Sequence, residues 1–208
     1  MISVPSGVWA IASSLGGVPA AKAWADRARS ADAWTFRNPA CGDGEALACL
    51  RALSAEATFL AVHGRSDWAR VGGADALIGG WKSLPWEQLR EQAPEGCLGL
   101  SVHEPEEMEQ AVDLGASFVF FGPVWPTPEK AGILKPKGLD GLRRACSFGV
   151  PVLALGGILE AGQAQECREA GAHGVAVLRG AGDPDQLASI LRGWWGEEGR
   201  PPRGPGFP

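Results

Sequence analysis

Short apolar segments alternate with longer amphipathic segments along most of the chain. Near-continuous apolar runs such as FVFFGPV and GVAVLRG are typical of parallel strands whose two faces are both buried. Successive runs are separated by about the length of one strand and one helix, so each run begins a predicted βα unit. The pattern predicts eight strands, over residues 8–12, 33–37, 58–63, 76–80, 97–102, 118–124, 150–156 and 174–179.

The segments between these runs predict helices. Residues 105–114 begin with a proline and acidic residues, as a helix N-terminus does, and Gly115 marks the end. Similar patterns predict helices over residues 139–146, 161–170 and 184–195. The alternation predicts a single small (β/α)8 TIM barrel over residues 1–195, followed by a flexible Gly- and Pro-rich tail over 196–208. The alternative is an open doubly wound sheet, which needs only about five or six strands.

The composition narrows the class of protein. The 208 residues include 19 Lys and Arg against 24 Asp and Glu, a net charge of -5, so the chain lacks the basic footprint of a nucleic-acid-binding protein. No apolar run reaches the roughly 18 residues that a membrane span needs. The five cysteines form no CxxC motif, which favours reduced thiols and a cytoplasmic location. The chain has no tyrosine, which removes one common general acid or base.

Cationic and hydroxyl side chains follow several of the predicted strands. The active site of a (β/α)8 barrel lies at the carboxyl ends of the strands. The candidate residues there are Arg37, His63, Arg65, Ser101 and His103. Such a set in an acidic chain suits a phosphorylated ligand, and either histidine could exchange protons near neutral pH. The alternative is that the histidines are structural and the arginines are surface charges; His173, at the opposite end, is not expected to act.

Glycine-rich turns follow the last two predicted strands. Loops after the seventh and eighth strands of such barrels frequently hold a phosphate with backbone N–H groups, which glycine lets approach closely. The long segment after the sixth strand could close over the same anion as a lid. The alternatives are a tight βα turn and a solvated surface loop. The predicted phosphate-binding residues are Thr127, Lys130, Gly156, Gly157, Arg179 and Gly180.

Several consecutive segments resemble one known family. They are SVHEPEEMEQAVDLGASFVFFGPVWPTPEK, KGLDGLRRA, PVLALGGI and AGAHGVAVLRG, in the family's order and spacing. The chain is similar in them to the superfamily of thiamine phosphate synthase and thiazole tautomerase, the latter called TenI. This resemblance implies a small (β/α)8 barrel and a phosphorylated thiazole as the ligand. In the synthases, a pyrimidine pyrophosphate also binds above the barrel and Mg²⁺ holds its pyrophosphate.

The resemblance also implies roles for single residues. Ser101, Thr127 and Lys130 look like the residues that contact phosphate groups. Gly156, Gly157 and Gly180 look like the thiazole-phosphate loops, in which Arg179 replaces the usual small hydroxyl residue. Arg37 looks like the arginine of the family's second-strand motif, although Asn38 and Pro39 follow it here in place of an acid and a lysine.

The chain departs from the synthase pattern at the metal site. An Asn-Asp pair is expected after the third strand, where this chain has His63-Gly64. A second aspartate is expected after the fourth strand, where this chain has Gly80-Trp81-Lys82-Ser83. Because Mg²⁺ prefers carboxylate oxygens, the sequence predicts neither a metal site nor a cofactor, and Mg²⁺ is expected only if the chain acts as a synthase.

Three functions follow from these features. The favoured hypothesis is an isomerase, a metal-independent TenI-like thiazole tautomerase in which His63 and His103 transfer protons. The histidine that tautomerases carry after the sixth strand is Pro123 here, so neither branch is matched in full. The alternatives are a divergent Mg²⁺-dependent thiamine phosphate synthase, a transferase, and a non-catalytic phosphate-ligand binder. The expected partner is a small phosphorylated thiazole, a homodimer is left open, and neither nucleic acid nor membrane is expected.

Overall fold

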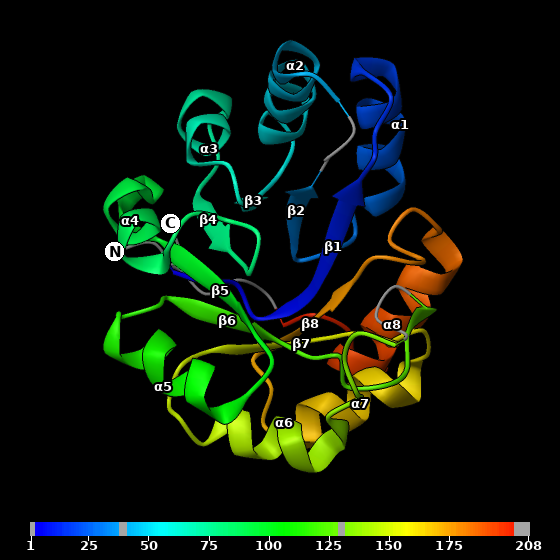
Figure 1. The fold of residues 1–208 in the computed structure, drawn as a ribbon. Helices are drawn as coiled ribbons and strands as arrows, with labels where there is room; N and C mark the ends of the chain where they lie inside the picture. Colours follow the sequence, from blue (N-terminus) through cyan, green and yellow to red (C-terminus); the bar gives the residue numbers. More distant parts are fainter. Residues whose placement is uncertain (1–2, 38–40, 129–131, 202–208) are drawn as a thin grey trace.

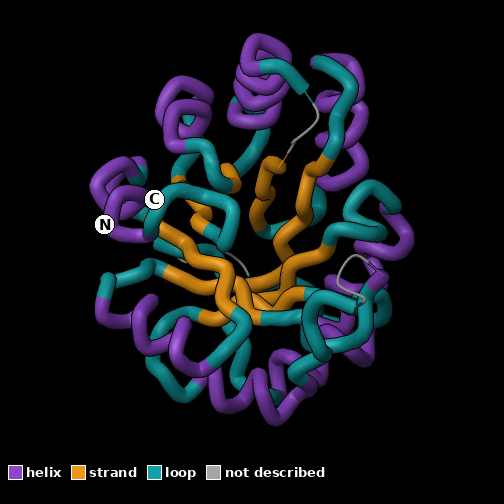
Figure 2. Tube along the Cα trace, viewed as in Figure 1, coloured by secondary structure: helices purple, strands orange, loops and turns teal. Residues whose placement is uncertain are grey.

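The computed structural model describes residues 3–37, 41–128 and 132–201. Strands gather at the centre of the molecule and helices surround them (Figures 1 and 2). The strands are β1 Gly7–Ser13, β2 Ala33–Arg37, β3 Leu60–His63, β4 Ala76–Gly79, β5 Leu98–Val102, β6 Phe118–Phe121, β7 Val152–Leu155 and β8 Gly174–Val177. The helices are α1 Val18–Ala28, α2 Asp43–Ser54, α3 Ser66–Gly72, α4 Trp86–Gln92, the 3₁₀ turn η1 Pro94–Gly96, α5 Pro105–Asp113, α6 Gly138–Cys146, α7 Ala161–Glu169 and α8 Pro184–Trp195.

The strands form one closed parallel barrel in sequence order from β1 to β8. The barrel closes where β1 pairs with β8, with Gly7 opposite Gly174. The predicted (β/α)8 barrel is therefore confirmed, and the open doubly wound sheet is wrong. Several strands are shorter than predicted because apolar residues beyond their ends, such as Phe59 and Leu178, also pack inside the barrel.

Aromatic side chains fill the barrel interior. The Trp9 ring lies 5.1 Å from that of Phe59 and 5.2 Å from that of Phe118 between centroids, and Phe120 packs edge-on against it. Gly99 makes room for this cluster, because a Cβ there would lie 2.3 Å from the Phe118 ring. Large and small residues thus alternate around the interior, which is a packed core rather than a pore.

A second apolar layer lies between the strands and the surrounding helices. Side chains alternate along each strand, so Leu98, Leu100 and Val102 of β5 face the helices while Gly99 and Ser101 lie on the inner face. The two α5 positions Met108 and Ala111 are completely buried against this layer. The two-residue period of each strand therefore decides which side chains reach the carboxyl-end opening of the barrel, called the mouth below.

The four predicted helices are present with nearly the predicted bounds. Helix α5 begins with a capping box, in which Glu104 and Glu107 satisfy the first backbone N–H groups. The N-cap residue of helix α8 is Asp183, whose carboxylate accepts from the N–H groups of Asp185 and Gln186. These caps fix where the loops from β5 and β8 turn back into helices.

The chain after α8 returns to the amino end of the barrel. Arg200 forms a 2.5 Å ion pair with Asp32, which is only 5% exposed. Asp32 also accepts from the Val8 N–H at 2.8 Å and the Trp195 Nε1–H at 3.1 Å. Arg200, within the predicted tail, thus contacts the barrel. Within residues 3–37, 41–128 and 132–201, no helix is both long and apolar enough to cross a membrane.

Candidate functional site at the carboxyl end of the barrel

Arg37 and His63 lie side by side at the mouth. Strands β2 and β3 pair with Phe36 opposite Val62, so the next pair along the ladder is Arg37 and His63. Thr35, two residues before Arg37, lies on the same inner face and is completely buried. The structure therefore brings together two of the residues predicted from the sequence and adds Thr35 beneath them.

His63 is held in a mostly apolar setting. Its Nε2 lies 3.1 Å from the Thr35 Oγ1, and its ring stacks on Phe120 at 5.9 Å between centroids with an interplanar angle of 20°. Burial, followed by the neighbouring Arg37 charge, lowers the pKa of His63 to about 3. The imidazole is therefore neutral near pH 7, so Arg37 supplies the positive charge at this point of the mouth.

The two predicted arginines are in different settings. Arg37 is exposed and makes no ion pair with any other residue that the structure describes. The Arg65 guanidinium donates to Asp67, forms a 3.0 Å ion pair with Asp43, and lies 4.2 Å from the centre of the Trp68 ring. These carboxylates raise the pKa of Arg65 above its ordinary value. The charge of Arg65 is already neutralised, whereas the charge of Arg37 is available to an anion.

His103 and Glu104 hold both ends of the long loop between β6 and α6. The His103 Nδ1 bonds to the carbonyl of Gly122, the residue before cis Pro123, where the loop begins. Glu104 pairs with Lys137, the residue before α6, where the loop ends. When His103 is neutral, this bond places its proton on Nδ1 and leaves Nε2 as the unprotonated ring nitrogen. The predicted catalytic residue His103 therefore also anchors the loop.

The β6–α6 loop packs on the glycine turn after β7. Gly156 and Gly157 have φ values of +99° and +73°, which favour glycine. The loop runs along this turn, since the Trp125 N–H donates to the Gly156 carbonyl at 3.1 Å. A Cβ on Gly157 would lie 2.6 Å from the Trp125 Cβ and 2.9 Å from the Pro126 carbonyl oxygen. The loop itself therefore explains part of the need for glycine here, as the tight-turn alternative anticipates.

The β8 loop meets the β6 loop through two predicted residues. The Arg179 Nη2 donates to the Thr127 Oγ1 at 3.3 Å, although the two residues are 52 positions apart. Gly180 follows with φ +80°, and a Cβ there would lie 2.2 Å from the Gln186 Oε1. Thr127, Arg179 and the glycine turns are thus gathered on one side of the mouth. Lys130 lies outside the described residues.

Ser101 lies on the inner face of β5, close to the turn after β4. A Cβ on Gly80 would lie 3.7 Å from the Ser101 Cβ. The predicted residues therefore occupy two sides of the mouth, with Arg37, His63 and Ser101 at the ends of β2, β3 and β5 and Thr127 with Arg179 above β6 and β8. The sequence analysis missed Thr35 and Phe120, which set the state of His63; the two-residue strand period from Arg37 would have pointed to Thr35.

The residues at the mouth do not fit the Mg²⁺ ion of the synthase pattern. Gly64 stands where the first carboxylate is expected, the turn expected to carry the second holds Lys82 and Ser83 instead of an acid, and the Nε2 of His63 is taken by Thr35. Three carboxylates of the described residues are held in ion pairs, Asp43 and Asp67 by the single guanidinium of Arg65 and Glu104 by Lys137. Across the described part of the chain, no group of three or more His, Cys, Asp or Glu residues could hold a metal ion.

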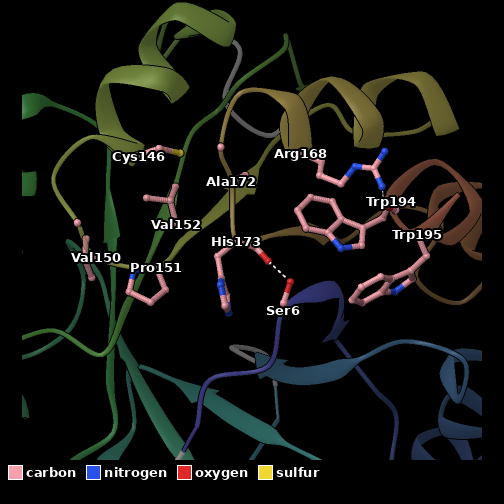
Figure 3. A pocket seen from close by; sticks show the side chains of 12 residues that line it. Ser6, Cys146, Val150, Pro151, Val152, Arg168, Ala172, His173, Trp194 and Trp195 are labelled. Carbon is pink, nitrogen blue, oxygen red and sulfur yellow. Dashed lines mark hydrogen bonds between the residues drawn. The ribbon is translucent and has the colours of Figure 1, made fainter. Parts of the chain in front are cut away.

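A cavity of about 520 Å³ lies at the opposite, amino end of the barrel (Figure 3). His173 lies in its wall, with Nε2 donating to the Val4 carbonyl at 3.0 Å and its carbonyl accepting from Ser6. Arg168 donates to the Trp194 carbonyl at 2.6 Å. Burial raises the pKa of the Cys146 thiol to about 11, which leaves it protonated and a poor nucleophile. The polar groups of this cavity are committed to the fold, so we place the candidate site at the mouth.

The fold and the mouth define a (β/α)8 barrel with glycine-rich turns after β7 and β8 and cationic side chains at its carboxyl end. The family model for thiamine monophosphate synthase matches residues 31–181, most of the chain, and the chain belongs to this family.

Named relatives are similar to this chain over part of their length. It is 36% identical over 140 residues to the thiamine-phosphate synthase of Salinibacter ruber, covering 65% of this chain and 61% of that protein. It is 41% identical over 129 residues to the putative thiamine-phosphate synthase of Geobacter sulfurreducens, covering 61% and 60%. The chain thus matches less than two thirds of the length of these relatives. Their names favour the synthase alternative over the tautomerase hypothesis.

Solved structures show the same barrel. The thiamine phosphate pyrophosphorylase from Pyrococcus furiosus is 26% identical, with a TM-score of 0.76 over 88% of this chain and 91% of that one. The (S)-3-O-geranylgeranylglyceryl phosphate synthase from Thermoplasma acidophilum is 14% identical with a TM-score of 0.68, a likeness of fold alone.

Proposed function

We propose that this chain is a transferase of the thiamine-phosphate synthase type, which binds a phosphorylated thiazole at the mouth of its barrel and joins it to a pyrimidine pyrophosphate with release of pyrophosphate. The match to the family model over residues 31–181 is the observation that carries this proposal. The names of the relatives from Salinibacter ruber and Geobacter sulfurreducens, and the likeness to the Pyrococcus furiosus structure, support it.

The thiazole phosphate would bind between the loops after β6, β7 and β8. The contact between Arg179 and Thr127 supports this placement, because it puts a guanidinium and a hydroxyl beside the Gly157 and Gly180 turns. A guanidinium binds phosphate oxygens through charge-assisted hydrogen bonds, and backbone N–H groups of glycine turns approach them without a side chain in the way.

The second, more highly charged substrate would bind on the β2–β5 side of the mouth. Arg37 has no carboxylate partner among the described residues, and Ser101 offers a hydroxyl on the same inner face. His63, whose pKa is lowered to about 3, would contribute as a neutral hydrogen-bonding group rather than as an acid. Arg37 would then stabilise the negative charge that develops on the departing pyrophosphate.

The decisive experiment is to incubate the purified chain with the thiazole phosphate and the pyrimidine pyrophosphate, with and without Mg²⁺, and to measure thiamine phosphate by chromatography. We expect product above the enzyme-free rate and expect its loss in the Arg37→Gln variant. Thermal stabilisation by the thiazole phosphate without any product would contradict the transferase and leave a non-catalytic binder.

The tautomerase remains a second candidate because Gly64 and Ser83 stand where synthase-type metal carboxylates are expected, with Lys82 beside the second position. In that reaction His103 would be the proton-transfer residue, since its Nδ1 is bonded to the Gly122 carbonyl and Nε2 is the ring nitrogen that would face the substrate. The low pKa of His63 makes it a weak base and disfavours the predicted role for it. NMR of a thiazole carboxylate phosphate incubated with the chain tests this candidate, and aromatisation no faster than in buffer would remove it.

A further inference from the structure

The turn after β4 presents a cation next to the His63 side of the mouth. The Gly80 N–H donates to the Ser83 Oγ at 2.8 Å and the Ser83 N–H donates to the Gly80 carbonyl at 2.9 Å, which fixes a tight turn with Trp81 and Lys82 at its tip. The Lys82 Nζ lies 5.0 Å from the centre of the Trp81 ring, and that indole is 71% exposed. The hydrogen-bonded turn and the Trp81 ring thus position the Lys82 ammonium group.

This turn adjoins the turn after β3. The Gly64 N–H donates to the Ile78 carbonyl of β4 at 2.8 Å, and a Cβ on Gly64 would lie 4.0 Å from the Ser83 Cβ. The two positions where the family resemblance places metal-binding carboxylates are therefore neighbours in this chain as well. Gly64 has no side chain, and the second position is Ser83 with Lys82 beside it, so two expected carboxylates are replaced by neutral residues and a lysine is added.

Among the described residues, three carboxylates of neighbouring elements are held in ion pairs, two of them by one guanidinium. The Asp43 and Asp67 carboxylates share the Arg65 guanidinium, and Glu104 is paired with Lys137. Arg37 stands beside the neutral His63 with no ion pair to another described residue. A divalent cation at this place would meet two positive side chains and a neutral imidazole, whereas a phosphate or pyrophosphate group would meet complementary charge.

We propose that this side of the mouth binds the pyrophosphate group of its ligand without a divalent metal, with Lys82 and Arg37 supplying the charge that a metal supplies elsewhere. The inference rests on the proposed function for the ligand class. The planar guanidinium of Arg37 can donate two hydrogen bonds to one phosphate group, and the ammonium of Lys82 can neutralise the other as a point charge.

The test is calorimetric titration of the full chain with inorganic pyrophosphate, once in EDTA and once in excess Mg²⁺. We expect binding in EDTA, and an affinity that Mg²⁺ lowers because the ion competes for pyrophosphate in solution. Lys82→Gln and Arg37→Gln are each expected to weaken binding in EDTA by about tenfold, the usual scale of one charge-assisted contact. Arg143→Gln is the matched control, since Arg143 lies on α6 and is paired with Asp140.

Two outcomes would overturn the proposal. One is a requirement for the metal, seen either as pyrophosphate binding that occurs only with Mg²⁺ or as saturable binding of Mn²⁺ to the chain alone. Electron paramagnetic resonance measures the Mn²⁺ binding. The other is an unchanged affinity of the Lys82→Gln variant, with circular dichroism showing that it is folded.

The proposed function and this inference fail separately. Formation of thiamine phosphate that stops in EDTA would overturn the metal-free site and keep the transferase. Metal-free binding of pyrophosphate without any thiamine phosphate would keep the site and overturn the transferase.

Discussion

The two ends of the barrel use charged side chains in opposite ways. At the amino end, the buried Asp32 accepts from a backbone N–H of Val8, from the indole of Trp195 and from the guanidinium of Arg200. At the carboxyl end, Arg37 has no ion pair within the described residues and its neighbour His63 is neutral. The Asp32 charge at the amino end therefore stabilises the fold, whereas the Arg37 charge at the carboxyl end can bind an anionic ligand.

The comparison also shows that the cavity and the candidate site lie at opposite ends of the barrel. The 520 Å³ cavity lies at the amino end, and its polar groups, from Arg168 to His173, already have partners within the fold (Figure 3). The mouth is marked instead by inward-facing polar residues at strand ends and by two loops joined through Thr127 and Arg179. A buried polar group must have its hydrogen bonds made, so the satisfied groups of the amino end indicate stability, whereas Arg37, with no ion pair to another described residue, indicates a ligand.

Replacing Asp32 is the strongest test of the amino end. Asp32→Ala leaves the buried Val8 N–H and the Arg200 guanidinium without their acceptor, and we expect a loss of about 3–5 kcal/mol in the free energy of unfolding. Urea denaturation followed by circular dichroism measures it. Asp140→Ala, at an almost fully exposed position on α6, is the control and should change stability by less than about 0.5 kcal/mol.

Binding at the mouth should survive this change. Below the unfolding transition, Asp32→Ala is expected to bind inorganic phosphate as the unaltered chain does. A folded Asp32→Ala protein with strongly weakened phosphate binding would show that the amino end takes part in the site.

Gly157 tests the packing of the β6 loop on the β7 turn. Gly157→Ala places a Cβ at φ +73° and against Trp125, so we expect a loss of about 1–3 kcal/mol in unfolding free energy together with weaker phosphate binding. Gly162→Ala is the matched control, because a Cβ there meets nothing within 4 Å inside α7 and alanine favours helix. Equal stability of the two variants, measured by urea denaturation, would contradict the strained turn.

His63 predicts a pH dependence that belongs to the mouth. Above about pH 6.5 its imidazole is neutral in both the folded and the unfolded chain and contributes nothing to the dependence. As the pH falls below 6.5, the unfolded chain takes up a proton that the folded chain refuses until the pH reaches about 3, so the unfolding free energy falls. One proton over about 1.5 pH units corresponds to about 2 kcal/mol, which is the upper limit of the loss in unfolding free energy between pH 6.5 and 5. The partial exposure of the His63 ring makes the expected loss smaller than this limit.

The His63→Gln variant isolates this contribution. Glutamine keeps a hydrogen-bonding group for Thr35 but does not titrate, so the variant should lose less stability than the unaltered chain between pH 6.5 and 5. Urea denaturation at both pH values, with pH 7.5 as the reference, gives the difference. Parallel pH profiles for the two proteins would mean that His63 is protonated in the folded chain.

The barrel could be predicted from the sequence, but strand ends and pairings could not. Eight buried parallel strands leave eight near-continuous apolar runs, and this signal is local. The ends were overestimated because Phe59 and Leu178 are apolar and lie inside the barrel without belonging to a strand. The role of Asp32 was missed because its partner Trp195 lies 163 residues away, and nothing local marks such a contact.

The candidate site was predictable to the same extent. The predicted strand ends placed Arg37, His63 and Ser101 at the mouth, and the two-residue period would have added Thr35. The environment of each group was not predictable, because burial and the stacking on Phe120, which join different strands, decide that His63 is neutral. The pairing of Arg65 with Asp67, two residues away, was visible in the sequence and is a reason to rank Arg65 below Arg37.

Arg179 provides the smallest and most direct test of the comparison between the ends. Arg179→Gln removes an exposed charge that contacts Thr127, so unfolding free energy should change by less than about 0.5 kcal/mol while the affinity for inorganic phosphate falls about tenfold. Arg168→Gln makes the same change beside the amino-end cavity, where the guanidinium bonds to the Trp194 carbonyl, and should leave phosphate affinity unchanged. Calorimetric titration of both variants with inorganic phosphate measures the contribution of each end to phosphate affinity separately. If Arg168→Gln weakened phosphate binding and Arg179→Gln did not, the anion would bind in the amino-end cavity, and the assignment of stability to one end and ligand binding to the other would be reversed.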